Sequence, residues 1–125
     1  MARDETDTMP LEGRDALVAY LESGNKTPDE FRIGTEHEKF GFYETDCSPV
    51  PYEGERGIRA LLEAMRGMLG WEPVMDGERI IGLFDTVNGG AISLEPGGQF
   101  ELSGAPLKTL HQTCREANAH LAQVR

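Results

Sequence analysis

The stretch FRIGTEHEKFGF, residues 31–42, decides how the chain is interpreted, because it places two glutamates inside an apolar segment. Glu36 and Glu38 are two residues apart, and such residues point to the same face of a β-strand, about 7 Å from each other. Phe31 and Ile33 are expected to pack on one side of this strand. Two neighbouring carboxylates repel each other unless water or a cation lies between them. The motif therefore requires either solvent or a positively charged partner.

A second acidic motif, ISLEPGGQFELSG, occupies residues 92–104. It places Glu95 at the end of one apolar strand and Glu101 in the next, and the Pro-Gly-Gly between them interrupts the ladder. Two such motifs in one small sheet could bring four carboxylates together. Mg²⁺ prefers oxygen ligands, so a magnesium site that also binds nucleotide phosphates is one interpretation. A solvent-exposed acidic face is the other, and spacing does not separate the two.

The remaining pattern predicts an α+β domain. Short helices are expected over residues 11–23 and 55–69, and a last helix from about Pro106 to the end of the chain. A long strand is expected over residues 31–43. Residues 71–104 read as a β-meander, because the turn signals DG, NGG and PGG separate four apolar segments.

Three helices are expected to carry apolar residues at helical spacing. The first is expected to end at Gly24 and the second at Gly70, since glycine is common just past a helix end. The apolar residues are Leu17, Val18 and Leu21 in the first; Ile58, Leu61, Leu62, Met65 and Leu69 in the second; and Leu107, Leu110, Cys114, Ala117, Leu121 and Val124 in the last.

The histidines and the tryptophan are expected to have structural roles. His37 lies between two glutamates and so points to the opposite face, as a core or interface residue. His111 and His120 lie beside the apolar stripe of the last helix, where they are structural or face solvent. Trp71 is expected to pack in the core.

Length and charge restrict the class of protein. The 125 residues are enough for one domain with one core. The formal net charge of −10, from 22 acidic and 12 basic residues, weighs against nucleic acids and anionic membranes as partners. The first ten residues, MARDETDTMP, are acidic and polar, unlike a secretory signal or a transit peptide, so a cytoplasmic location is expected. Cys47 and Cys114 are expected to be free thiols.

Several segments together closely resemble the plant and proteobacterial type of glutamate–cysteine ligase. They are FRIGTEHEKFGF, GLF followed by AISLEPGGQFELSGAPLKTLHQTC, and AHLAQV, so the resemblance runs from about residue 31 to the end. It implies a glutamine synthetase-like fold, in which helices back a curved, mainly antiparallel sheet that binds ATP, metal ions and glutamate. EHEKF and GQFE resemble the metal-binding strands of that fold. The resemblance thus maps Glu36, Glu38, Glu95 and Glu101 onto ligand positions for Mg²⁺ or Mn²⁺.

The implied reaction is ATP-dependent ligation of the side-chain carboxylate of L-glutamate, through an acyl phosphate, to L-cysteine. Its product is γ-glutamylcysteine, in the first step of glutathione biosynthesis. Members of the family have several hundred residues, so residues 1–125 are expected to be the N-terminal part of the catalytic domain. Alone it is expected to be inactive, because the C-terminal part with the basic residues for glutamate and phosphate is missing. The alternatives are a ligase for a different amine acceptor and a small acidic, non-catalytic binding domain.

Overall fold

The computed structural model describes residues 8–124, which form two compact units divided after Phe31. The first unit contains helix α1 (Arg14–Ser23) and the short 3₁₀ helix η1 (Pro28–Glu30). Helix α1 confirms the predicted first helix and ends at Gly24, but its apolar side chains remain exposed.

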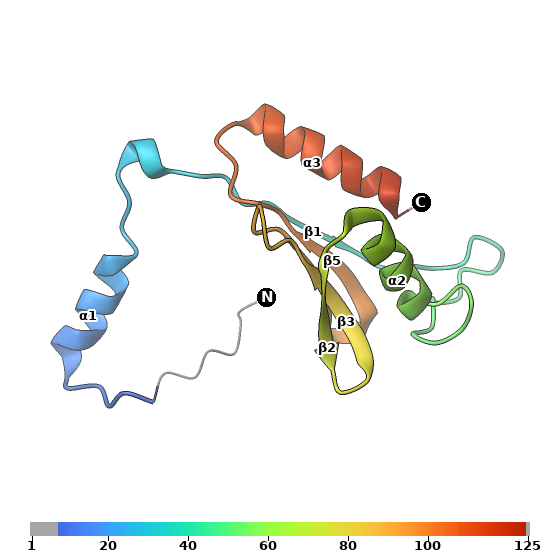
Figure 1. Ribbon diagram of the computed structural model, residues 1–125, viewed down its shortest axis with the longest axis horizontal. Coiled ribbons are helices and arrows are strands. Elements are labelled where there is room, and N and C mark those ends of the chain that lie inside the picture. Colours follow the sequence, from blue (N-terminus) through green and yellow to red (C-terminus); the bar gives the residue numbers. More distant parts are fainter. Residues whose placement is uncertain (1–7, 125) are drawn as a thin grey trace. The chain divides into compact units, whose positions relative to one another are not determined.

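The second unit is an antiparallel sheet with two further helices, which confirms the α+β class (Figure 1). The strand order is β1-β5-β4-β3-β2, so the meander is confirmed and the first strand pairs with the last. Within residues 8–124 no helix is long and apolar enough to cross a membrane. The elements of this unit are β1 (Glu36–Lys39), α2 (Ile58–Leu69), β2 (Glu72–Asp76), β3 (Arg79–Phe84), β4 (Ala91–Glu95), η2 (Pro96–Gly98), β5 (Gln99–Ser103) and α3 (Leu110–Gln123).

Strand β1 is much shorter than the predicted strand over residues 31–43. Regular pairing covers four residues, flanked by isolated bridges from Ile33 to Leu107 and from Phe42 to Pro49. The expected packing of Phe31 and Ile33 is also wrong, since these side chains are exposed. The apolar residues change from odd to even positions along this segment, and a continuous strand would have to place them on opposite faces.

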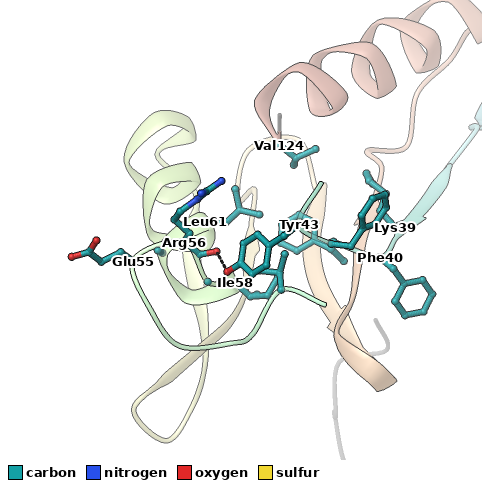
Figure 2. A pocket seen from close by; sticks show the side chains of 14 residues that line it. Lys39, Phe40, Tyr43, Glu55, Arg56, Ile58, Leu61 and Val124 are labelled. Carbon is teal, nitrogen blue, oxygen red and sulfur yellow. Dashed lines mark hydrogen bonds between the residues drawn. The ribbon is translucent and has the colours of Figure 1, made fainter. Parts of the chain in front are cut away.

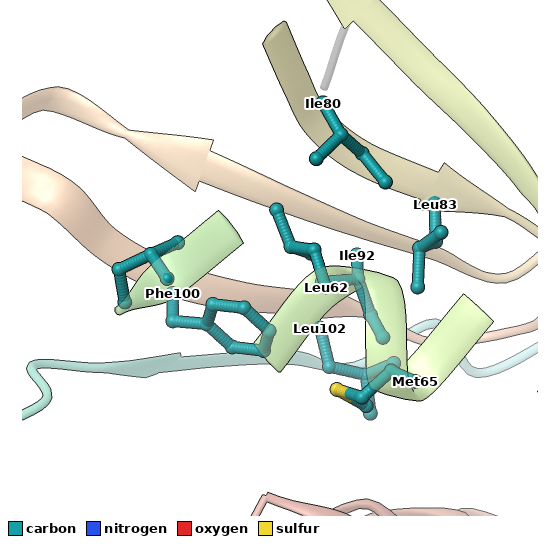
Figure 3. Close-up of a cluster of buried hydrophobic side chains, with 8 residues drawn as sticks. Leu62, Met65, Ile80, Leu83, Ile92, Phe100 and Leu102 are labelled. Carbon is teal, nitrogen blue, oxygen red and sulfur yellow. The ribbon is translucent and has the colours of Figure 1, made fainter. Parts of the chain in front are cut away.

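Helix α2 packs on one face of the sheet and supplies one side of the core. Its buried residues are Ile58, Leu62 and Met65, as the helical periodicity predicts, and Gly70 ends it in a left-handed conformation with φ of 68°. Figure 3 shows Leu62 and Met65 facing the sheet. Trp71 packs partly buried against this core, as expected. The sheet contributes Ile80, Leu83, Ile92, Phe100 and Leu102.

A β-bulge in β3 brings two core residues to the same face. Val74 of β2 pairs with Gly82, whereas the next residue, Met75, pairs with Ile80, so Ile81 is the extra residue. Ile80 and Leu83 can therefore both point toward α2 although they are three residues apart.

Helix α3 begins at Leu110, later than the predicted start at Pro106. Thr109 is its N-cap: the Thr109 hydroxyl accepts a hydrogen bond from the backbone N–H of Gln112, and the Gln112 side chain accepts one from the backbone N–H of Thr109. Residues before this capping box are held extended by the bridge between Leu107 and Ile33.

The buried face of α3 also differs from the predicted apolar stripe. Leu110 and Cys114 are exposed, so the expectation that Cys114 is a buried hydrophobe is wrong. The buried residues are instead Thr113 and His120. Val124, at the end of the predicted stripe, does pack partly buried against the core, so the prediction fails in the first half of the helix and holds at its C-terminal end.

His120 is a buried histidine without a hydrogen-bond partner. Its ring is 3% exposed and stacks on Phe100, with ring centroids 6.1 Å apart and planes at 12°. Neither ring nitrogen has a hydrogen-bond partner. Burial, together with the charges of Lys39 and His37, lowers the pKa of His120 to about 4. The ring is therefore neutral in the folded protein at neutral pH.

Replacement of Leu62 by alanine tests the core. Leu62 is fully buried, so Leu62→Ala should lower the free energy of unfolding by about 3 kcal/mol. Met68 lies on the same helix but is 61% exposed, and Met68→Ala should cost less than about 0.5 kcal/mol. Urea denaturation measures both, and equal losses would contradict this assignment of the buried face of α2.

His120 should make stability depend on pH between 6.5 and 4. As the pH falls below 6.5, the unfolded chain binds a proton at His120 while the folded chain does not, so the free energy of unfolding decreases. The total loss is about 3 kcal/mol over this window. His120→Phe keeps the stacked ring without titrating, so its denaturation midpoints should fall less steeply with pH. Parallel profiles for both proteins would refute the prediction.

Candidate metal centre

Pairing between β1 and β5 brings the two acidic motifs together. Glu38 lies directly opposite Glu101, and Glu36 lies opposite Ser103. Residues directly opposite in an antiparallel pair share a face of the sheet. His37 pairs with the core residue Leu102 and so lies on the other face, as predicted.

The pairing of β4 with β5 adds the fourth glutamate to this face. Ser93 lies opposite Glu101, and Glu95, two residues further along β4, lies opposite Gln99. The turn between the strands uses Gly97 and Gly98, with φ of 81° and 76°, a region that favours glycine. The four predicted glutamates therefore share one face, which we call the acidic face; it consists of Glu36, Glu38, Glu95 and Glu101 and lies opposite the face that packs on α2.

Glu101 is the central and most buried residue of the acidic face. The residue is only 4% exposed. The hydroxyl of Ser103 donates a hydrogen bond of 2.7 Å to Oε1, and the hydroxyl of Ser93 donates a longer one of 3.4 Å to Oε2. The pKa of Glu101 lies below its ordinary value, chiefly because of the Ser103 hydroxyl; burial opposes this, and the Ser93 hydroxyl lowers the pKa further.

The other three carboxylates surround Glu101 without closing on a common point. Glu36 and Glu38 are exposed, and Glu95 is half-buried. In the part of the chain that the structure describes, no three Asp, Glu, His or Cys side chains are arranged to hold a metal ion. Repulsion between like charges on adjacent strands favours such a separation in the metal-free sheet.

The chemistry of the acidic face suits a hard cation. Its donors are carboxylate oxygens, the ligands that Mg²⁺ and Mn²⁺ prefer, whereas zinc sites usually contain sulfur or imidazole nitrogen. Cys47 and Cys114 are free and exposed, and His37 lies on the opposite face. The acidic face therefore has ligand atoms of the type that Mg²⁺ and Mn²⁺ prefer, although in the described residues they are not arranged around a common point.

Ser93 and Ser103 are the members of this face that the sequence interpretation missed. Ser103 has the same parity as Glu101 in β5, and Ser93 has the same parity as Glu95 in β4, which was the signal that could have identified them. Gln99 also shares the face of Glu101 in β5 and lies opposite Glu95.

A separate pocket of about 570 Å³ lies at the end of β1, between α2 and Val124, the residue that follows α3. Figure 2 shows Tyr43, Ile58, Leu61 and Val124 around it, with the Tyr43 hydroxyl donating to the backbone oxygen of Arg56. Its lining is largely apolar and includes none of the four glutamates. The pocket and the acidic face are therefore separate features of the second unit.

Neutralising Glu38 should stabilise the metal-free chain. Glu38 lies directly opposite Glu101, so Glu38→Gln removes a repulsion and should raise the free energy of unfolding by about 0.5 kcal/mol at low salt. The gain should shrink in 0.5 M NaCl, a concentration at which exposed charges are screened over about 5 Å. Glu72→Gln, an exposed change at the far edge strand β2, is the control and should have no such effect. Denaturation curves at both salt concentrations that show Glu38→Gln less stable than the native chain would contradict the prediction.

The chain is similar to plant enzymes that are much longer. It is 56% identical over 118 residues to the chloroplastic glutamate–cysteine ligase of Arabidopsis thaliana, which covers 94% of this chain and 22% of the relative. The chloroplastic enzyme of Nicotiana tabacum is 56% identical over 116 residues, covering 93% and 21%. Glutamate–cysteine ligase A, chloroplastic, of Oryza sativa subsp. japonica is 51% identical over 118 residues, covering 94% and 23%. The chain thus spans about a fifth of the length of these relatives.

These names contradict the expected cytoplasmic location, since the relatives are chloroplastic enzymes. The composition of residues 1–10, on which that expectation depended, does not decide the compartment. The sequence model described as Glutamate-cysteine ligase family 2 matches residues 32–125, the same boundary at which the second compact unit begins. The chain therefore belongs to glutamate–cysteine ligase family 2.

Proposed function

We propose that this chain is part of an enzyme that uses ATP to join L-glutamate to L-cysteine, giving γ-glutamylcysteine. Membership of the family and the names of the relatives support the reaction class. The structural observation that carries the proposal is the acidic face, in which register places Glu38 directly opposite Glu101. Such a face is suited to bind the metal ions that accompany nucleotide phosphates.

Glu38, Glu95 and Glu101 would hold Mg²⁺ or Mn²⁺, with Glu36 at the margin of the same face. The metal, when bound, neutralises negative charge on the phosphate oxygens. Glu101 is buried and fixed by hydroxyls, so it provides a rigid ligand. Glu36 and Glu38 are exposed and can adjust to a metal or a phosphate-bearing substrate.

The reaction would proceed in two steps. An oxygen of the γ-carboxylate of glutamate attacks the γ-phosphorus of ATP, the bond to the bridging oxygen breaks, and γ-glutamyl phosphate and ADP form. The amine of cysteine then attacks the acyl carbon, phosphate leaves, and the amine loses a proton. Electrostatic stabilisation of the phosphoryl oxygens is the contribution expected of the acidic face with its cations.

We further propose that the sheet is the first part of a glutamine synthetase-like catalytic domain. The antiparallel sheet, with helices on one face and carboxylates on the other, supports this assignment. The chain spans about a fifth of its relatives, which supports a catalytic domain completed by other parts of the polypeptide. The groups that bind glutamate, cysteine and phosphate would come from those parts, so residues 1–125 alone would be inactive.

The test is a ligase assay on the complete polypeptide that the gene encodes, with ATP, Mg²⁺, L-glutamate and L-cysteine. It should release ADP and form γ-glutamylcysteine, and Glu101→Gln should lower kcat by about 100-fold or more through loss of a ligand. Glu72→Gln, on the edge strand β2, should leave kcat unchanged.

Substituting other amines for cysteine separates this reaction from ligation to a different acceptor. Product formed only with another amine would exclude cysteine as the natural acceptor. A Glu101→Gln enzyme with native kcat and native metal requirement would refute the role assigned to the acidic face.

A further inference from the structure

We propose that Ser103 is a positioning residue, whose hydroxyl holds the Glu101 carboxylate in the orientation needed to bind a metal ion. The inference rests on the proposed metal site and adds to it a residue outside the four glutamates. It follows from the geometry of one short hydrogen bond and from the place of Glu101 in the sheet.

The hydrogen bonds of Glu101 leave part of its carboxylate available. A carboxylate has two oxygens with about four lone-pair directions. Ser103 donates to Oε1 at 2.7 Å and Ser93 donates to Oε2 at 3.4 Å. Each oxygen thus accepts one hydroxyl and retains a lone pair for a cation. Glu38, directly opposite on β1, and Glu95, on the same face of β4, are the neighbouring carboxylates that the same cation could reach.

Ser103 is better placed than Ser93 to fix this orientation. A hydroxyl that donates to a carboxylate at 2.7 Å forms a strong, charge-assisted bond, whereas a bond of 3.4 Å is weak. Ser103 lies two residues from Glu101 on the same strand, so the backbone of β5 itself sets the separation of the two side chains. The residues opposite Ser103 are Ala91 on β4 and Glu36 on β1, and the Ser103 hydroxyl donates to Glu101 rather than to Glu36.

A positioning role and a structural role have different consequences. If the hydroxyl only satisfies a buried carboxylate, its loss lowers stability and leaves metal affinity unchanged. If it orients the carboxylate, its loss weakens metal binding, typically 10- to 100-fold for a residue that supports a metal ligand. The two roles can therefore be separated by measuring affinity and thermal stability on the same variants.

The experiment is a calorimetric titration of the complete polypeptide with Mn²⁺ alone. Ser103→Ala should weaken Mn²⁺ binding about 10-fold, and Ser103→Thr, which retains the hydroxyl, should bind nearly as tightly as the native protein. The matched control is Ser48→Ala. Ser48 also donates to a carboxylate oxygen at 2.7 Å, that of Asp46, but lies in a loop. Ser48→Ala should leave Mn²⁺ affinity unchanged.

Each outcome has a definite meaning. If Ser103→Ala binds Mn²⁺ as tightly as Ser48→Ala and only its melting temperature falls, Ser103 is structural and the positioning role is refuted, while the metal site stands. If the native protein does not bind Mn²⁺, or if Glu101→Gln binds it as tightly as the native protein does, the metal site itself fails and the role of Ser103 fails with it.

Discussion

The arrangement of the second unit depends on keeping a carboxylate, that of Glu101, on a central strand of the sheet. A buried charge is tolerated only with hydrogen-bond partners, and Ser103 and Ser93 supply them from β5 itself and from the adjacent β4. The apolar side chains whose burial stabilises the fold are confined to the opposite face, under α2. One face of the sheet therefore provides stability, and the other is free to concentrate negative charge.

Much of the fold could be predicted because its signals are local. The periodicity of residues 55–69 correctly predicts α2, and the glycine-containing turns of residues 71–104 correctly predict the meander. The errors arose where tertiary contacts or polar residues decide the outcome. The bridge between Ile33 and Leu107 keeps the residues before α3 extended, so this helix begins later than predicted. A buried face that includes Thr113 and His120 cannot be found by a search for apolar residues alone.

The acidic face was partly predictable for a related reason. Alternation along a strand shows that Glu36 and Glu38 share a side, and the resemblance of two motifs to known metal-binding strands indicated which glutamates belong together. Which strand pairs with which, and in what register, depends on contacts between segments far apart in the chain. A search for charged residues does not find Ser93 and Ser103, because their hydroxyls are neutral, although both donate hydrogen bonds to the Glu101 carboxylate.

The four-residue length of β1 has a consequence for folding. Because β1 has only four residues, it forms few backbone hydrogen bonds with β5. These bonds alone discriminate poorly between the native register and a shifted one. A shift by one residue would turn both β1 glutamates toward the apolar core and bring His37 and Lys39 to the other side. Burying two unpaired carboxylates is strongly unfavourable. The alternation of charged residues along EHEK thus disfavours a shifted pairing of β1 with β5, independently of any ligand.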